Sequence, residues 1–192
     1  MKKFLCYSCE SLVSVSNKED KCPNCGAKLW KSREMKGRKW LKDRAWSSFS
    51  KYIRLRDSIK TTGTTTHCIC YTCKKIEPLK KIQAGHLSTG RNDDVLFDED
   101  YVRGQCVACN VFCKGRQGDF AIEMVKELHS KGLSYEEAVD EVSKALAASG
   151  PGASFHISDE ELASIYFMYE KKCKDLMKAN GDKNDDAPLD KN

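Results

Sequence analysis

Apolar residues recur every three to four positions between about Trp40 and Ile59. This spacing predicts an amphipathic α-helix. Lysines and arginines occupy most of the remaining positions, so the helix is expected to be basic, and the stretch TTGTTT at 61–66 is expected to end it. The helical spacing of the apolar stripe favours a place in the core over a base-stacking surface. The stripe consists of Leu41, Ala45, Trp46, Phe49, Tyr52 and Ile53.

The same spacing predicts three further helices in the second half of the chain. Their apolar faces span residues 120–128, 135–146 and 162–176. A serine with a glutamate three positions later precedes the second and the third, which is the capping box that marks a helix start. The stretch 148–154 between them is predicted to be a linker, and residues 181–192 are predicted to be disordered. The two boxes are Ser134 with Glu137, and Ser158 with Glu161.

Eleven cysteines are many for a chain of 192 residues. The N-terminus lacks the apolar core of an export signal and the cysteine total is odd, so we expect zinc sites in a reducing cytoplasm and not disulfides. Eight cysteines form four C-x-x-C pairs, and four thiolates fill the tetrahedral shell of a structural zinc site. The predicted sets are Cys6, Cys9, Cys22 and Cys25, and then Cys70, Cys73, Cys106 and Cys109.

The two cysteine sets differ in the length of chain between their pairs. Twelve residues separate the pairs of the first set, which is the spacing of a zinc ribbon. Thirty-two residues separate those of the second set, so a bound zinc would hold the ends of this insertion together. Cys68 remains an alternative ligand to Cys70, and His67 is a weaker alternative. Cys113 and Cys173 are expected in the core.

His86 lies within the insertion, and Asn110 follows its last cysteine directly. A histidine can deprotonate water near neutral pH, and an asparagine carbonyl oxygen is a hard ligand suited to Mg²⁺. A base, a hard-metal ligand and a zinc frame are the parts needed to hydrolyse a phosphodiester. The alternative is a histidine without a catalytic role. The nearby carboxylates are Asp93, Asp94, Asp98, Glu99 and Asp100.

The net charge of +5 is distributed unevenly along the chain. Residues 28–60 hold twelve lysines and arginines against three acids, whereas residues 155–192 hold nine acids against six lysines. A basic stretch with an acidic tail suits a polyanion such as DNA, and a solvated helix face is an equal alternative. No apolar run is long enough to span a bilayer, so we expect a cytoplasmic protein with no membrane partner.

Short motifs occur in a fixed order from Ala45 to Gly115. They are Ala45-Trp46, Phe49, Tyr52 to Asp57, Cys70 to Cys73, Ala84-Gly85-His86, Phe97 to Glu99, Gln105-Cys106, Cys109-Asn110 and Gly115. In this order they resemble the HNH (ββα-metal, or His-Me finger) nucleases, including the endonuclease VII group. They more closely resemble the phage recombination proteins of the NinG/Rap type. The resemblance covers about residues 44–128.

The resemblance implies a structure-selective, metal-dependent DNA endonuclease that acts on Holliday junctions or other branched DNA in phage recombination. It implies His86 as the general base, Asn110 as a ligand of catalytic Mg²⁺ or Mn²⁺, and structural Zn²⁺ in the second cysteine set. The expected fold is α+β, with a small zinc-stapled ββα-metal core, flanking helices and an N-terminal zinc ribbon. The expected units are a zinc ribbon at 1–30, a basic amphipathic helix at 31–62, the nuclease core with its following helices at 63–150, a C-terminal helix at 151–180 and a disordered tail at 181–192.

Two positions depart from the HNH pattern. Gly85 stands where many of these enzymes have an aspartate metal ligand, and Tyr101 stands near the position of a central asparagine. The metal carboxylate is therefore expected from Asp94 or Asp98, unless His86 is itself a metal ligand. The departures favour, as the alternative function, a non-catalytic zinc-finger protein that binds DNA or assists recombination. A third option is a redox protein that uses its thiols and binds no zinc.

Basic residues near the motifs are candidates for contacts with DNA. Arg91 follows His86 and is a candidate catalytic contact to the scissile phosphate. Lys114 and Arg116 lie at the start of a helix, where free N–H groups bind phosphate. A symmetric homodimer and phage recombination or replication proteins are further candidate partners. The DNA-binding candidates are Arg38, Lys39, Arg44, Lys51, Arg54, Arg103, Lys114 and Arg116.

Overall fold

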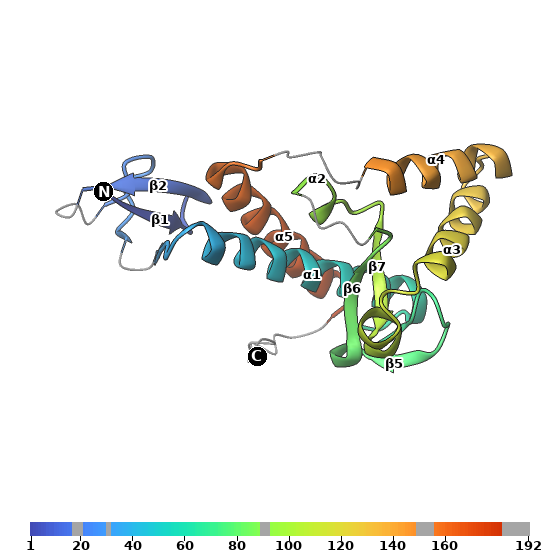
Figure 1. The fold of residues 1–192 in the computed structure, drawn as a ribbon. Coiled ribbons are helices and arrows are strands. Elements are labelled where there is room, and N and C mark those ends of the chain that lie inside the picture. The colour runs from blue at the N-terminus through green and yellow to red at the C-terminus, as the bar shows by residue number, and fades with distance from the viewer. Residues whose placement is uncertain (17–20, 30–31, 89–92, 149–155, 182–192) are drawn as a thin grey trace.

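The computed structural model of the chain describes most of its residues (Figure 1). The described ranges are 1–16, 21–29, 32–88, 93–148 and 156–181. The predicted linker at 148–154 and the predicted tail at 181–192 fall almost entirely outside them. Within the described ranges, no helix combines the length and the apolar character needed to cross a membrane.

The N-terminal unit is a small antiparallel sheet. Its strands are β1 (Lys2–Cys6), β2 (Ser11–Val15) and β3 (Arg33–Glu34), in the order β2-β1-β3. Lys2 pairs with Val15 and Cys6 pairs with Ser11, so the first cysteine pair lies at the turn between β1 and β2. β3 adds to the far edge of β1. The sheet therefore continues four residues past the boundary predicted at residue 30.

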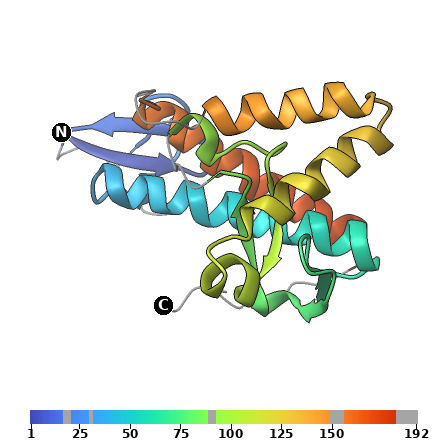
Figure 2. The same ribbon diagram turned by 45° about the vertical axis from the view of Figure 1, so that its right-hand side comes forward.

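Two long helices form the body of the protein. They are α1 (Arg38–Thr62) and α5 (Asp159–Ala179), and they lie against each other in both ribbon views (Figures 1 and 2). The basic helix predicted for 40–59 is confirmed, and it ends in a left-handed Gly63. The predicted capping box at Ser158 is present. The buried contacts between the helices come from Leu41, Ala45, Leu162, Ala163, Tyr166 and Phe167.

Phe49 is the centre of the contact between the helices and the rest of the fold. Its ring packs edge-on against Tyr169 of α5 at 4.9 Å and against Phe97 at 5.7 Å. Ala84 and Val102 pack in the same cluster. α1 is thus covered by α5 on one side and by strands on another, so the aromatic stripe lies largely in the core, as its spacing indicated.

The central segment consists of two antiparallel hairpins. β4 (His67–Ile69) pairs with β5 (Ile76–Pro78), and β6 (Ile82–His86) pairs with β7 (Val102–Cys106). A 3₁₀ turn η2 (Leu79–Lys81) joins the hairpins, and a short helix α2 (Asp93–Leu96) lies between β6 and β7. A π-helical turn η3 (Ala108–Phe112) follows β7. The central segment is thus built from short strands joined by turns.

α3 (Gln117–Ser130) and α4 (Tyr135–Ala148) pack on each other at the far end of the molecule from the N-terminal sheet (Figure 1). Both predicted helices are present, and Ser134 and Glu137 exchange the two hydrogen bonds of a capping box. Their shared core also includes Leu87, which directly follows β6. The buried members of this core are Leu87, Phe120, Met124, Val125, Ala138 and Val142.

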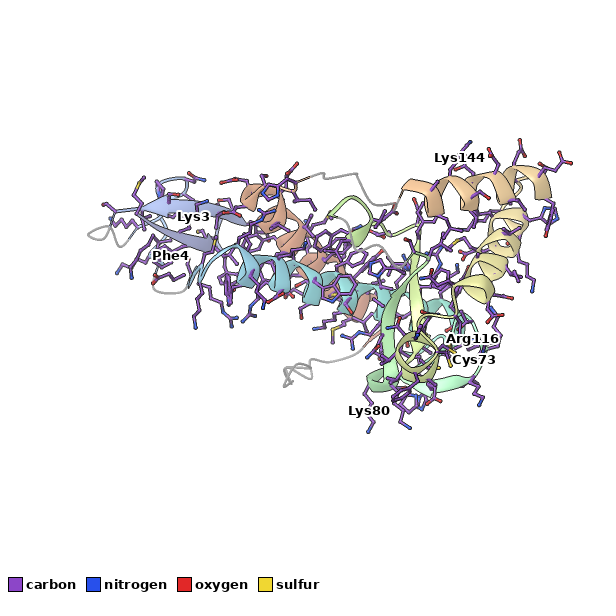
Figure 3. All side chains as sticks on the ribbon, in the orientation of Figure 1. Lys3, Phe4, Cys73, Lys80, Arg116 and Lys144 are labelled. Carbon is purple, nitrogen blue, oxygen red and sulfur yellow. The ribbon has the colours of Figure 1, made fainter. Side chains whose placement is uncertain are left out.

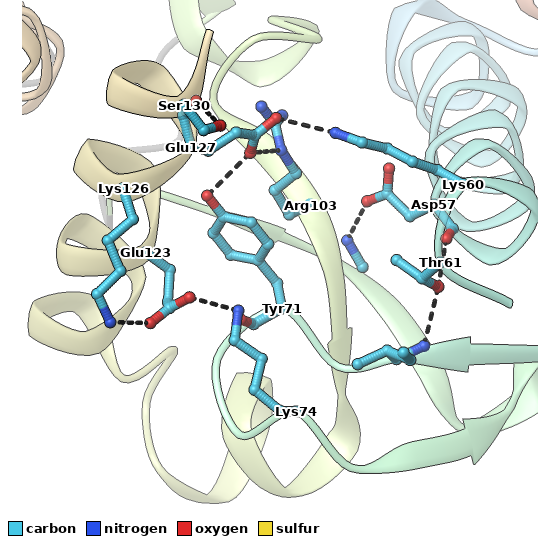
Figure 4. A pocket seen from close by; sticks show the side chains of 12 residues that line it. Asp57, Lys60, Thr61, Tyr71, Lys74, Arg103, Glu123, Lys126, Glu127 and Ser130 are labelled. Carbon is cyan, nitrogen blue, oxygen red and sulfur yellow. Dashed lines mark hydrogen bonds and ion pairs between the residues drawn. The ribbon is translucent and has the colours of Figure 1, made fainter.

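Glu127 of α3 joins four elements through charged hydrogen bonds (Figure 4). Its carboxylate accepts from Arg103 Nε of β7 and from the Tyr71 hydroxyl, each at 3.0 Å. Lys60 of α1 and Lys131 also lie 3.0 Å from it. Burial opposes the charge of Glu127, but the hydrogen bond and charge of Arg103 outweigh it and hold the Glu127 pKa well below its usual range. Arg103 is only 6% exposed, and Glu127 is partly exposed, so the guanidinium is the buried member of the pair.

We expect Glu127→Gln to lower the free energy of unfolding by about 2–4 kcal/mol at pH 7, because it leaves the buried Arg103 guanidinium without a counter-charge. The folded-state pKa is depressed, so the stabilisation is present above the ordinary carboxyl pKa of about 4.3 and is lost as the pH falls below it. Urea unfolding at pH 7 and pH 3.5 measures this. Exposed Glu136→Gln on α4 is the matched control. An equal loss at both pH values would contradict the assignment.

Candidate functional site

The first cysteine tetrad closes the N-terminal unit. The Cys6 and Cys25 sulfurs are 3.8 Å apart, and those of Cys9 and Cys22 are 3.7 Å apart. Sulfurs at the corners of a tetrahedron with Zn–S bonds of about 2.3 Å lie about 3.8 Å apart, whereas a disulfide needs about 2.05 Å. All four sulfurs lie within 4.8 Å of one another, so this tetrad could hold a structural zinc ion.

The second tetrad joins the two hairpins. Cys70 and Cys73 come from the turn between β4 and β5, and Cys106 and Cys109 come from the end of β7 and from η3. Their sulfurs also lie within 4.8 Å of one another. Burial opposes the Cys70 thiolate, but hydrogen bonds from Thr72 Oγ1 and from backbone N–H groups, including that of Cys106, lower the Cys70 pKa to about 6. These donors favour the thiolate form that zinc requires.

The three remaining cysteines lie outside the tetrads. Cys68 faces Thr61 of α1, and its burial raises its pKa to about 11. Cys70 is therefore the tetrad member, and neither Cys68 nor His67 replaces it. Cys173 is buried, as predicted. The prediction for Cys113 is wrong, because Cys113 is exposed in the turn after η3.

His86 occupies the last position of β6, on the face that packs against α1. Its ring stacks on Trp46 with 5.2 Å between centroids and 19° between planes. Its Nε2 lies 3.2 Å from the Leu96 carbonyl oxygen of α2. Because a carbonyl only accepts, this hydrogen bond places the proton on Nε2 and the lone pair of the neutral ring on Nδ1. His86 also lines a small cavity with Ser88, Val95, Asp98, Tyr101 and Ala145.

Asn110 lies on the other face of the β6–β7 hairpin. Its Nδ2 donates to Gln83 Oε1 at 2.7 Å. Gln83 and His86 are three positions apart on one strand, and side chains alternate between faces along a strand. The second tetrad therefore fixes both residues to the same hairpin without bringing His86 and Asn110 together.

Gly85 has no room for a side chain. A Cβ built there would lie 1.9 Å from Gln105 Oε1 and 2.7 Å from its Cδ. Gln105 is fully buried, and its Nε2 donates to the Gly115 carbonyl at 2.9 Å. Its Oε1 is the buried side-chain oxygen without a hydrogen-bond partner among the residues the structure describes. The glycine of the AGH motif is thus required by the glutamine of the QC motif.

The predicted catalytic-metal ligands are not assembled in the described part of the chain. Asp98 shares the cavity with His86, but Asn110 does not. The carboxylate of Glu99 accepts from Tyr169 and Lys172 of α5. The Asp94 side chain and all of Arg91 lie outside the described residues. Among the described residues, the clusters of three or more His, Cys, Asp or Glu ligands are the two cysteine tetrads.

The predicted basic residues of α1 divide into two groups. Arg38 is committed to the fold, because it pairs with Asp159 of α5 at 3.0 Å and donates to the Ile157 carbonyl. Lys39 is exposed, and the other three are partly exposed. Those three lie at i, i+7 and i+10, so they share one side of the helix. They are Arg44, Lys51 and Arg54.

The basic residues of the central segment also differ in their exposure. Arg103 is buried against Glu127, so the structure does not present it to a phosphate, contrary to our expectation. Arg116 is exposed and pairs with Asp119 at 2.7 Å. Lys114 is exposed in the same turn. These two basic residues remain available at the surface beside the second tetrad, as Figure 3 shows for Arg116 and Cys73.

Sequence reasoning missed the partners that orient the candidate residues. Trp46 and the Leu96 carbonyl orient His86, and Gln83 orients Asn110. Arg56 donates to the carbonyls of Glu99 and Val102, which ties α1 to the insertion. The ordered motifs contained Trp46 and Arg56, but only the fold assigns them these contacts.

Comparison with known families gives one match. Residues 9–180 match the family of the bacteriophage lambda NinG protein. The chain belongs to the NinG family. The NinG family suggests a function related to phage recombination, and the predicted resemblance to it is confirmed. No curated protein and no solved structure matches the chain.

We expect the purified protein to contain about two zinc ions per chain, one in each tetrad. Cys9→Ser and Cys73→Ser should each lower the content to about one, because a serine hydroxyl is a poor substitute for a thiolate ligand. Elemental analysis after gel filtration measures this. Cys113→Ser is the control, since Cys113 lies outside both tetrads. Zinc-free wild-type protein would contradict both assignments.

We expect Gly85→Ala to destabilise the fold by about 1–3 kcal/mol, because the new methyl group displaces the buried Gln105 side chain. In Gly85→Ala/Gln105→Ala the clash is gone, so the double variant should lose less stability than the two single losses combined. Thermal unfolding of the four proteins measures the coupling. Gly118→Ala on α3 is the control, since its Cβ would meet no atom within 4 Å. Additive losses would show that the two positions do not compete for space.

Proposed function

We propose that this NinG-family protein is a structure-selective DNA endonuclease that acts on Holliday junctions or other branched DNA in phage recombination. The observation that supports the proposal is the position of the His86 side chain. The ring ends a strand of the β6–β7 hairpin, whose base could be held by zinc, and it stacks on Trp46 of the basic helix α1. A strand-strand-helix order, β6-β7-η3, also suits a ββα-metal core.

In this proposal His86 acts as the general base. The Leu96 carbonyl holds the ring, and the imidazole takes a proton from a water molecule. The water oxygen bonds to phosphorus, the bond from phosphorus to the leaving sugar oxygen breaks, and that oxygen takes a proton from solvent. Stacking on Trp46 holds the ring in place through the reaction. Asp98 lines the same cavity, and its carboxylate favours the charged imidazolium that forms.

The basic side of α1 is the proposed grip on the DNA backbone. Lys39, Arg44, Lys51 and Arg54 lie on the helix that also carries Trp46. Contacts of this kind bind phosphates of any sequence and position the strand without selecting bases. They predict a binding that weakens steeply as salt is added. They also place a phosphate-binding surface on the helix that touches the proposed base.

A divalent Mg²⁺ or Mn²⁺ ion would stabilise the charge on the phosphate and on the leaving oxygen when bound. The described residues do not fit the donor set expected for it, because Asn110 and His86 lie on opposite faces of the hairpin. We therefore assign no step of the mechanism to the metal. The dependence of cleavage on the metal is measured by repeating the cleavage assay without added metal.

A non-catalytic DNA-binding or recombination-accessory protein is the second candidate. The observation that favours it is the same separation of His86 from Asn110. Two cysteine tetrads and a basic helix are sufficient for a binding module. Under this alternative His86 serves the fold, through its contacts with Trp46 and the Leu96 carbonyl.

We expect wild-type protein with added Mg²⁺ or Mn²⁺ to cleave a labelled four-way junction faster than linear duplex of the same sequence. His86→Ala should lower the cleavage rate about 10²- to 10⁴-fold, the usual contribution of a general base. Single-turnover gels measure the rate. Junction affinity, measured by gel shift, should change by less than about threefold, because phosphate contacts carry most of the affinity.

His129→Ala is the matched control for cleavage, since His129 is exposed on α3 and contacts the Leu133 carbonyl and the Tyr135 ring. His86→Gln removes the ring but keeps a polar side chain of similar length, and its thermal unfolding shows whether loss of the ring disturbs the fold. Tight junction binding with no cleavage in either metal would overturn the nuclease proposal and support the accessory role. Full cleavage by His86→Ala would exclude His86 as the base.

A further inference from the structure

The end of η3 exposes two consecutive large apolar side chains. Val111 is 51% exposed and Phe112 is 78% exposed. They lie between the last cysteine of the second tetrad and the start of α3. Nothing in the mechanism proposed above uses them. Large apolar side chains exposed together in this way are a candidate contact surface.

The backbone of this turn is unusual at every step. Cys113 N–H donates to the Ala108 carbonyl at 2.9 Å, which closes a π-helical turn. Lys114, Gly115 and Arg116 then follow with φ of 50°, 83° and 45°. Left-handed backbone costs about 1–2 kcal/mol for a residue with a side chain, and π turns and strained residues concentrate at functional sites. The sequence thus maintains a costly conformation here.

Hydrogen bonds to buried groups fix the conformation of this turn. Gln105 Nε2 donates to the Gly115 carbonyl at 2.9 Å, and Gly115 N–H donates to the Cys109 carbonyl at 2.9 Å. Asn110 donates to Gln83 of β6. The exposed Phe112 is therefore presented by a rigid support that includes the second tetrad.

Basic side chains flank the exposed apolar pair. Lys114 and Arg116 follow it in the same turn. The Asn110–Gln83 hydrogen bond docks η3 beside the start of β6, and exposed Lys80 and Lys81 directly precede that strand. In Figure 3 the labelled Lys80 and Arg116 lie at the same end of the molecule. An aromatic ring between cations suits a nucleic acid, which offers both stacking faces and phosphates.

We propose that Phe112 stacks on an unpaired or unstacked base at the branch point of DNA, while Lys114 and Arg116 contact the adjacent phosphates. The inference rests on the proposed function in taking DNA as the partner. Apolar side chains that enter base steps bind best where stacking is already interrupted. Phe112 would therefore supply preference for branched over linear DNA, on a face of the hairpin separate from His86.

The test compares Phe112→Ala, Phe112→Trp and wild type on a four-way junction with 2-aminopurine at the branch, and on linear duplex. No divalent metal is added, so binding is measured without cleavage. We expect Phe112→Ala to weaken junction binding about ten- to a hundredfold, the usual effect of losing one stacked base, with less than about threefold change on duplex. Phe112→Trp should retain junction binding and the fluorescence change.

Tyr135→Ala is the matched control, because Tyr135 is an exposed aromatic residue at the start of α4. Equal losses on junction and duplex, or unchanged junction binding by Phe112→Ala, would overturn the inference. So would a requirement for Phe112 in binding another phage protein with DNA binding unchanged. Junction-selective binding that depends on Phe112, without any cleavage, would support this inference while the nuclease proposal fails.

Discussion

Four cysteine sulfurs converge from chain segments that are distant in sequence. Thirty-two residues separate the pair Cys70 and Cys73 from the pair Cys106 and Cys109, and the four sulfurs lie within 4.8 Å of one another. The free energy of binding a metal there would offset the entropy that is lost when this insertion is closed into a loop. Once the pairs are joined, the β4–β5 turn, β7 and η3 form one unit, and β6 is carried on it by pairing with β7. The placement of every candidate residue on the hairpin depends on this closure.

Gln105 connects this closure to β6 and to the turn that follows η3. Its side chain lies on Gly85 at one end and supports Gly115 at the other. An unpartnered buried oxygen costs about 1–3 kcal/mol, and Gln105 Oε1 has no hydrogen-bond partner within the described residues. The Nε2 of the same side chain donates to the Gly115 carbonyl in the turn that follows Phe112. The residues shared with the NinG/Rap-type motifs therefore include packing partners as well as candidate reactive groups.

Features that depend on the spacing of nearby residues were predictable from the sequence. Features that depend on which elements pack against each other were not. The helices and the two tetrads follow from apolar periodicity and C-x-x-C spacing. The burial of Arg103 depends on Glu127, which lies 24 positions away on α3. The exposure of Cys113 depends on a π turn that no residue pattern announces. The separation of His86 from Asn110 depends on which strand residue meets η3.

The glycine at position 85 has a different meaning once the hairpin is known. Considered alone, Gly85 suggests a nuclease that has lost an aspartate ligand. In the structure a Cβ there would meet the buried Gln105 side chain, so packing alone accounts for the glycine. Asn110, bonded to Gln83, likewise docks η3 on β6. The question of catalysis therefore rests on the face of the hairpin that holds His86, Trp46 and Asp98, and not on the departures from the HNH pattern.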